Sequence, residues 1–236
     1  MSEQPVSSEQ SSGRSSKEPG CSVTDAVNRR KTIRKFTDAP VADATIRQLL
    51  AGAARAPSGG NVQPWRVFVV NGESMARFRA HIADLKPGKP EYEVYPPNLW
   101  DPYRTNRFEL GELMYATMGI ARDNKEARYA HLARNLDFFG APASIFCFID
   151  RKMGSAQWSD LGMFLQTFML LAQEAGLDTC PQEAWAPWAE TIQTFVEAPE
   201  DEMLFCGVAL GTADWDAPVN SLESPRMPVD QFATWV

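Results

Sequence analysis

Three short apolar runs constrain the fold of this chain most strongly. They are Val67–Val70, Ser144–Ile149 and Met203–Ala209. Each run is short, and apolar residues follow one another in it instead of alternating with polar ones. Such runs are expected of strands that are covered on both faces. We therefore predict a buried sheet built from segments that lie far apart in the sequence.

The segments between these runs have helical spacing. Apolar residues from Ile46 to Ala54 recur at helical intervals, and this pattern ends before Pro57, as the restriction on residues that precede proline favours. A short helix over 26–31 can begin at Thr24 or Asp25, whose oxygens cap free N–H groups. Further helices are predicted over 72–85, 107–121, 124–139, 159–176 and 185–197, with a proline-rich interruption over 87–102. The helix over 159–176 is apolar nearly all round and is predicted to be central.

The length and composition indicate one main domain. The chain has 236 residues, which permits one substantial core. Residues 1–22 are dominated by Ser, Glu, Gln, Gly and Pro and are expected to form a disordered tail. No linker or repeat divides the rest, so we expect residues 23–236 to fold as a single unit.

Positive charge is concentrated near the start of an acidic chain. The net charge is -7, yet residues 29–35 hold five cations: Arg29, Arg30, Lys31, Arg34 and Lys35. A compact basic cluster of this kind suits a small anion such as a phosphate monoester. The alternative is the solvated face of a short helix, on which Arg30 and Arg34 lie four apart, or a basic loop. The acidic balance argues against a nucleic-acid partner.

A second arginine, near the other end of the chain, favours the phosphate interpretation. Arg226 lies in the sequence Pro225-Arg226-Met227-Pro228, between two prolines. A guanidinium forms two parallel hydrogen bonds to phosphate oxygens and stays charged at any relevant pH. We therefore expect Arg30 and Arg226 to lie at the same site.

Cysteine and histidine usage gives no sign of a metal or a disulfide. The four cysteines have no C-x-x-C spacing and are expected to be reduced. His81 and His131 are the two histidines, and neither has a carboxylate pattern beside it, so we predict ordinary surface or helix residues and no metal site. There is no apolar run of the ~20 residues that a membrane span needs and no secretory signal pattern. These features predict a cytoplasmic location and no membrane contact.

Several motifs together resemble the FMN-dependent nitroreductase family, in particular its nitrobenzoate-reductase-like branch. The resemblance covers roughly residues 24–236 and is carried by Arg30–Phe36, Pro57–Trp65, Leu177–Trp185, Cys206–Gly211 and Pro225–Pro228. It implies an α+β fold of three layers, α/β/α, with a mixed, mainly antiparallel central sheet. It also implies an intertwined homodimer, in which the C-terminal end wraps over the partner and two equivalent sites lie at the interface.

The resemblance implies a role for each motif. Arg30, Lys31, Thr32 and Arg226 are expected to hold the phosphate of FMN. Arg34 is expected to face the pyrimidine edge of the flavin and to stabilise its reduced form, the alternative being a second phosphate ligand. The turn residues Pro57, Ser58, Gly59 and Asn61 are expected at the ring edge, and Gln63 at the ribityl chain. Pro181, Gln182 and Glu183 are expected beside flavin N5, where the backbone N–H near Glu183 donates a hydrogen bond.

The segment that covers the substrate varies most within the family. Trp100, Tyr103 and Tyr115 are candidates to sandwich a flat ring, and Arg104 and Arg107 could steer an anionic substrate. Of the wider aromatic set, which adds Phe108, Phe138 and Phe139, at least half are expected to pack in the core.

The expected reaction is a ping-pong transfer of two electrons. NADPH or NADH delivers hydride to flavin N5, and a nitroaromatic compound or a quinone then takes it up. Relatives on this fold carry out reductive dehalogenation or break down flavin, although the Glu, Tyr and Lys grip of a dehalogenase cannot be identified here. The chain could instead be a flavin-binding protein without turnover, or an interaction protein that holds no flavin.

Overall fold

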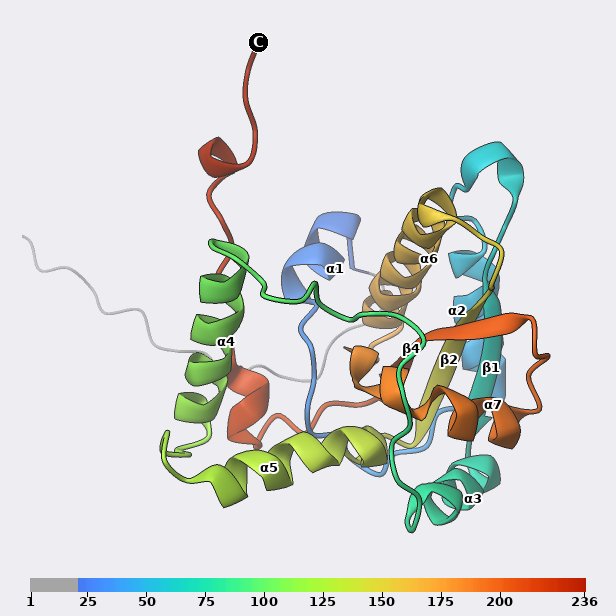
Figure 1. The fold of residues 1–236 in the computed structure, drawn as a ribbon, viewed down its shortest axis with the longest axis horizontal. Coiled ribbons are helices and arrows are strands. Elements are labelled where there is room, and N and C mark those ends of the chain that lie inside the picture. Colours follow the sequence, from blue (N-terminus) through green and yellow to red (C-terminus); the bar gives the residue numbers. More distant parts are fainter. Residues whose placement is uncertain (1–20) are drawn as a thin grey trace, which may run out of the picture.

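The computed structural model describes residues 21–236 (Figure 1). The predicted disordered tail therefore lies outside the described residues, apart from its last two. Of these, Ser22 caps the first helix, α1 (Val23–Arg29), and forms reciprocal hydrogen bonds with Asp25. The helix thus begins earlier than predicted and ends at Arg29, before the rest of the basic cluster.

Four antiparallel strands form the central sheet. They are β1 (Arg66–Asn71), β2 (Ala143–Asp150), β3 (Asp178–Gln182) and β4 (Glu202–Gly211), in the order β1-β2-β4-β3. Three match the predicted apolar runs. The edge strand β3 was not predicted, because Pro181 makes the segment look like a loop, although an edge strand tolerates proline. In the described residues the strands pair only in the antiparallel sense, whereas a mixed, mainly antiparallel sheet was predicted; the parallel contact at this sheet is an isolated bridge between Thr32 and Thr179.

Helices cover both faces of the sheet and confirm the three-layer architecture. On one face lie α2 (Asp43–Ala53) and α6 (Ser155–Glu174). On the other lie α3 (Glu73–Ile82), α7 (Ala189–Val196) and the 3-10 segments η2 (Arg134–Gly140) and η3 (Glu183–Trp188). The remaining short 3-10 segments are η1 (Gly59–Asn61), η4 (Pro218–Ser221) and η5 (Val229–Gln231).

Strand β2 shows why the apolar runs do not alternate with polar residues. Ile145 and Cys147 pack under α2 and α6, whereas Phe146 and Phe148 pack under α3 and α7. The pairing of β2 with β4 shifts between Cys147 and Phe148, where Phe205 is the extra residue. The sheet therefore has an apolar core on each face.

Helix α6 is less enclosed than predicted. One side packs on the sheet and on α2, but Met163 on the outer side is 39% exposed. Helix α6 therefore carries apolar side chains on its outer side that a single chain does not bury.

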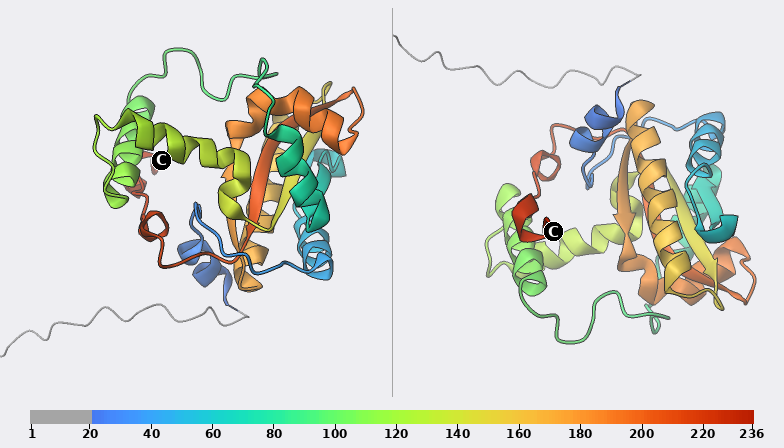
Figure 2. Two further views of the ribbon diagram at one scale, coloured as in Figure 1. Left: turned by 90° about the horizontal axis from the view of Figure 1, so that it is seen from below. Right: turned by 90° about the horizontal axis from the view of Figure 1, so that it is seen from above.

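Two helices form an extension beside the sheet. They are α4 (Tyr103–Thr117) and α5 (Lys125–Ala133), and we call residues 103–133 the helical arm (Figure 2). Helix α4 stands away from the sheet, and α5 leads back to it. The Arg128 guanidinium joins the two helices by pairing with Glu112 at 2.6 Å and lying 4.2 Å from the centre of the Tyr115 ring. The predicted helix over 124–139 is shorter in the structure: α5 ends at Ala133 and η2 follows, in which Phe138 and Phe139 adopt left-handed backbone angles (φ 48° and 56°).

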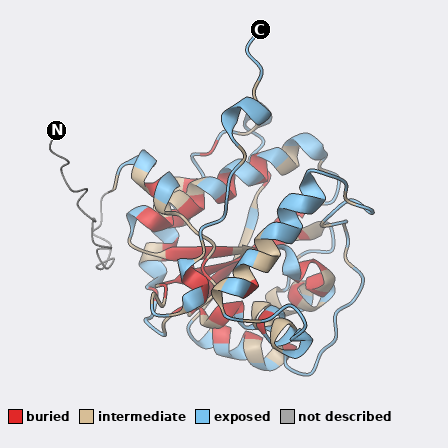
Figure 3. Ribbon diagram, turned by 90° about the vertical axis from the view of Figure 1, so that its left-hand side faces the viewer, coloured by how far each residue is buried: buried red, intermediate tan, exposed pale blue. Residues whose placement is uncertain are grey.

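The C-terminal segment, residues 222–236, extends past α4 and away from the body (Figures 1 and 3). Phe232 is 66% exposed and Trp235 is 82% exposed. Large apolar side chains such as these gain about 1.5–3 kcal/mol each when they are buried. A single chain leaves that stabilisation unused.

Candidate functional site

One pocket gathers cations from both ends of the chain. It has a volume of about 60 Å³, and we call it the basic pocket. It is lined by Arg30, Lys31, Thr32, Arg34, Leu110, Leu222, Ser224 and Arg226. The expectation that residues 30 and 226 share a site is therefore met within a single chain. Arg29 and Lys35, the other members of the sequence cluster, do not line it.

The local fold explains how these side chains reach the pocket. The helical geometry ends at Arg30 (φ -59°, ψ 121°), and the chain then runs extended along β3. The Ile33 N–H donates to the Thr179 carbonyl at 3.0 Å, and the side chains of Ile33 and Phe36 are buried. Because Ile33 and Phe36 point into the core, Thr32 and Arg34 lie on the pocket side. The basic cluster therefore continues from the helix into a loop and does not form one face of a helix.

The electrostatics of the pocket favour an anion. Burial, and secondly the positive charge of Arg226, lower the pKa of Arg30. The Lys31 ammonium pairs with the exposed Glu223 carboxylate at 3.1 Å. Arg226 donates to the Ser224 hydroxyl at 2.6 Å and to main-chain carbonyls of its own segment. Like charges held together in this way are stabilised by a bound phosphate.

His131 is a residue whose importance the sequence did not reveal. It lies on α5, as a helix residue, but it is buried, and its ring packs between those of Tyr115 and Phe139. Its Nε2 has no hydrogen-bond partner. Burial, then the charges of Arg34 and Arg134, lower the pKa of His131 to about 4, so the ring is neutral at physiological pH. No spacing pattern in the sequence marks this position.

The segment predicted to lie beside flavin N5 begins in the edge strand β3. Pro181 is half-buried, and Gln182 is buried and donates from its side-chain amide to the Asn135 carbonyl at 2.9 Å. Glu183 starts η3 with an exposed side chain. The loop that follows α3 crosses close by, where the Gly88 N–H donates to the Pro187 carbonyl at 2.7 Å. Within one chain, the hydrogen bond from the Gln182 side chain to Asn135 therefore joins the end of β3 to η2.

The polar turn, residues 57–63, is not part of the basic pocket. Gly59, Gly60 and Asn61 form η1 beside the beginning of α6, whereas α1, which leads into the pocket, contacts α6 around Leu171. Asp160, next to the turn, and Leu171 are eleven residues apart, which is roughly 16 Å along a helix axis. In Figure 1, α6 lies between α1 and the turn. A single chain thus holds the two predicted halves of the site apart.

The candidate substrate residues differ in their surroundings. Trp100 and Tyr103 are exposed, and their rings meet edge to face at 5.6 Å. Arg104 pairs with Asp101, and the Arg107 guanidinium lies 4.4 Å from the centre of the Tyr95 ring. Tyr115, by contrast, is buried inside the helical arm. Phe138 and Phe139 are buried too and Phe108 is exposed, so half of the aromatic set packs in the interior, as expected.

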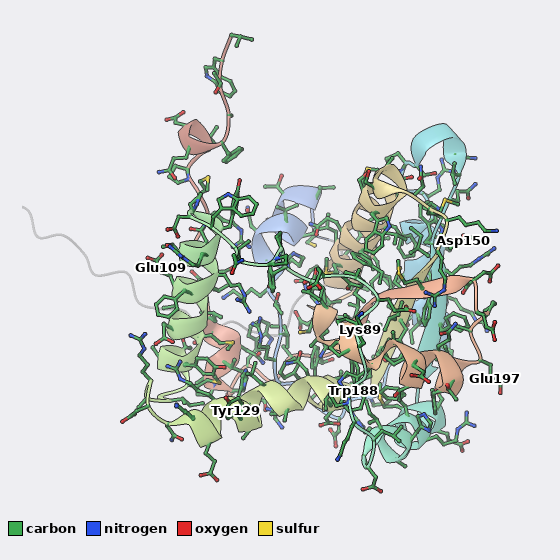
Figure 4. All side chains as sticks on the ribbon, in the orientation of Figure 1. Lys89, Glu109, Tyr129, Asp150, Trp188 and Glu197 are labelled. Atoms are coloured by element: carbon green, nitrogen blue, oxygen red, sulfur yellow. The ribbon has the colours of Figure 1, made fainter. Side chains whose placement is uncertain are left out.

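A larger cavity adjoins the basic pocket. It has a volume of about 550 Å³ and lies between α4 and the C-terminal segment, and it shares Leu110 and Arg226 with the basic pocket. Its lining includes Pro102, Asn106, Glu109, Met227 and Gln231. Figure 4 labels Glu109 on α4. The basic pocket therefore continues into a space large enough for part of an extended ligand.

Residues 21–236 contain neither a candidate membrane span nor a candidate metal site. No helix in this part of the chain is long and apolar enough to cross a membrane. No group of three or more His, Cys, Asp and Glu side chains in the same residues is placed to hold a metal ion. All four cysteines are free thiols.

The fold and the site define an α+β protein with a three-layer core and a phosphate-sized basic pocket formed by its two ends. Comparison with known proteins places the chain within a family. The sequence profile of the Nitroreductase family matches residues 27–212, and the chain belongs to this family.

Similar proteins cover nearly the whole chain. It is 36% identical to a 4-nitrobenzoate reductase of Pseudomonas putida over 87% of this chain and 92% of that protein. It is 34% identical to a chloronitrobenzene nitroreductase of Comamonas testosteroni over 91% of this chain and 96% of that protein. Among solved structures, the FMN and NADPH-dependent nitroreductase NfnB from Sphigopyxis sp. strain HMH superposes with a TM-score of 0.88 at 42% identity, covering 92% of this chain and 99% of that one.

Proposed function

We propose that this protein is an FMN-dependent NAD(P)H oxidoreductase that reduces nitroaromatic compounds, with quinones as further acceptors. The observation that carries the proposal is the convergence of Arg30 and Arg226 in one pocket. Membership of the Nitroreductase family and the activities in the names of its relatives support it.

The basic pocket fits the phosphate end of FMN. Arg30, Lys31, Thr32 and Arg226 supply charged and hydroxyl donors to a space of about 60 Å³. Burial, and secondly the positive charge of Arg226, lower the pKa of Arg30, which supports an anion as the ligand. A phosphate would supply negative charge and accept hydrogen bonds from several sides.

Arg34 is the residue that we assign to the reduced state of the cofactor. FMN, when bound, accepts and donates hydride. Arg34 is half-buried, is fixed through its main-chain N–H, and is close to the neutral His131. A fixed guanidinium beside the flavin ring stabilises the negative charge of the reduced form and so raises the reduction potential. The N–H groups near Glu183 would orient the ring from the side of β3.

We further propose that two chains complete each site. The polar turn, residues 57–63, lies on the other side of α6 from the basic pocket of its own chain, so a homodimer could bring the turn of one copy to the pocket of the other. The exposed Phe232 and Trp235 of the C-terminal segment support an arm that wraps over the partner. Removing residues 229–236 should then shift the protein from dimer to monomer in sedimentation and release FMN together with the dimer.

The substrate side is assigned to the exposed rings and cations around the start of α4. Trp100 and Tyr103 are accessible for stacking, and Arg104 and Arg107 add positive charge for a carboxylate or a phosphate. Tyr115 would act from inside the helical arm, by holding α4 against α5. A cytoplasmic location, where NAD(P)H is available, completes the proposal.

The test is an anaerobic half-reaction with purified protein. The protein should be yellow and release FMN on denaturation, NADPH or NADH should bleach it, and 4-nitrobenzoate should restore the colour. Parallel additions of a quinone and a halogenated phenol identify the preferred acceptor class. A yellow protein that neither nicotinamide bleaches would instead be a flavin carrier, and a colourless protein that takes up no FMN would exclude both.

A further inference from the structure

Asp160, on α6, is buried beneath the polar turn and has an unusual environment for a carboxylate. It is 4% exposed, and the Gly59 N–H lies 3.3 Å from both of its oxygens. Within residues 21–236 no lysine, arginine or histidine side chain forms an ion pair with it. Burying a carboxylate with so few partners costs free energy compared with an apolar side chain. Its presence is therefore not explained by stability alone.

The turn that Asp160 contacts has a strained backbone. Gly60, Asn61 and Gln63 all have positive φ angles, of 57°, 59° and 52°. For a residue such as Gln63 this conformation is unfavourable and persists only where the surroundings impose it. Strained segments of this kind concentrate at ligand sites, where they hold groups in a geometry that a relaxed loop would not keep.

The hydrogen bonds of the turn show where it is attached. Four are internal. The N–H groups of Asn61 and Val62 donate to the carbonyls of Ser58 and Gly59 at 2.9 and 3.2 Å. The Gln63 N–H donates to Ser58 Oγ at 3.0 Å, and Gln63 Nε2 donates to the Asn61 carbonyl at 3.2 Å. The end of the turn is fixed by Trp65, whose ring stacks on Phe164 at 5.0 Å. The beginning is fixed to α6 by the bond from Gly59 to Asp160. The strained turn is thus joined to α6 at both ends, by a hydrogen bond to Asp160 at its beginning and by ring stacking on Phe164 at its end.

We propose that Asp160 is a positioning residue, which holds the N–H of Gly59 so that the turn over residues 58–63 is preformed for flavin. This inference rests on the proposed function, in which that turn contacts the cofactor. Asp160 does not touch the ligand in this scheme. It lowers the cost of binding by keeping the turn ordered before the cofactor arrives.

Two substitutions separate the hydrogen bond from the charge. Asp160→Ala removes the acceptor, whereas Asp160→Asn keeps one oxygen in the same place. In the FMN-free protein, Asp160→Ala should speed hydrogen exchange across residues 58–63. It should also raise the Kd for FMN about tenfold or more, as the loss of a hydrogen bond to a charged group predicts. Asp160→Asn should stay within about threefold of the wild type.

The matched control is Asp150, a carboxylate at the end of β2, shortly before α6 begins. Asp150 Oδ1 accepts the Lys152 N–H at 2.8 Å and makes no bond to the turn. Asp150→Ala should leave both the exchange of residues 58–63 and the Kd for FMN unchanged. A loss in this variant equal to that of Asp160→Ala would mean that any damage near α6 has the same effect, and would overturn the inference.

Gly59→Pro tests the donor instead of the acceptor. Proline lacks the N–H, and the extended backbone of Ser58 (φ -144°, ψ 149°) is compatible with a following proline. If Asp160 acts through this bond, Gly59→Pro and Asp160→Ala should not add when combined. Additive losses would contradict the proposal, and so would an Asp160→Asn variant as impaired as Asp160→Ala.

The two readouts separate failure of the inference from failure of the proposed function. Wild-type protein that does not bind FMN refutes the function, whatever the variants do. Wild-type protein that binds FMN, together with an Asp160→Ala variant that keeps both the wild-type Kd and the wild-type exchange rates, refutes the role of Asp160.

Discussion

The side chain of Asn220 holds the main chain at Arg34 in place. Asn220 Oδ1 accepts the Arg34 N–H at 2.8 Å, and Asn220 Nδ2 donates to the Lys35 carbonyl at 2.7 Å and to the Asp214 carbonyl at 2.8 Å. Asn220 is 1% exposed, and 186 residues separate it from Arg34. The amide thus extends the main-chain pairing of Lys35 and Thr37 with residues 212–214 by one more residue, to Arg34.

Replacing Asn220 with Ala should destabilise the protein and weaken cofactor binding together. The Arg34 N–H loses its partner, and the Lys35 and Asp214 carbonyls keep only the N–H groups of Asp214 and Ala217, so we expect the free energy of unfolding to fall by about 2 kcal/mol. Urea unfolding measures this loss, and flavin fluorescence measures the Kd for FMN. Asn28→Ala, at an exposed position in α1, is the control. Stability equal to the wild type would contradict the structural role given to Asn220.

Replacing Arg226 with Ala should act on the phosphate and not on the ring. We expect the Kd for FMN to rise about tenfold to a hundredfold, because a charged hydrogen-bond partner is lost. Riboflavin has no phosphate, so its Kd should hardly change. Arg77→Ala, on the exposed side of α3, should affect neither ligand. If both flavins lose affinity equally, Arg226 does not hold the phosphate.

Replacing Arg34 with Ala should lower the reduction potential of the bound flavin. Loss of a charged hydrogen bond of about 1.4–2.8 kcal/mol from the reduced state corresponds to roughly 30–60 mV for a two-electron couple. Spectroelectrochemical titration of the saturated protein gives the potential independently of the Kd. An unchanged potential combined with weaker binding would make Arg34 a phosphate ligand instead.

His131 should make the folded protein sensitive to acid. Its pKa is about 4 in the folded state against an ordinary 6.5, so the unfolded chain binds more protons between these values. The free energy of unfolding should therefore decrease as the pH falls from 6.5 towards 4. His131→Phe keeps a flat ring beside Tyr115 and Phe139 and should remove this part of the slope. Chemical unfolding at several pH values tests it, and equal slopes in the two proteins would exclude this residue as the cause.

The sequence predicted the layers better than the connections. The runs around Phe68, Phe146 and Val208 were found as strands because burial on both faces removes polar alternation. Strand β3 was not, because Pro181 hides an edge strand whose pairing depends on Gly207 and its neighbours in β4. The end of α5 was placed too late, because the chain continues from Ala133 as the 3-10 segment η2, and no local pattern indicates the left-handed angles of its buried Phe138 and Phe139.

The candidate site could be predicted only where a motif is continuous in sequence. Arg30 and Arg226 were paired in advance because each stands in a distinctive basic or proline-rich context. Asn220, Asp160 and His131 were missed because single buried polar residues act through partners that only the fold brings close. The contacts to flavin assigned to Arg34 and Arg226 stay predictions, which the substitutions above test.

The placement of the polar turn and the basic pocket on different flanks of one chain has a genetic consequence. In a symmetric pair each chain would contribute a different half to each of two centres. A chain defective only in its turn and a chain defective only in its pocket would then each be inactive alone. If the two chains are co-expressed in equal amounts and pair at random, about half of the dimers would be hybrids, each with one intact site. About a quarter of all sites would then be active.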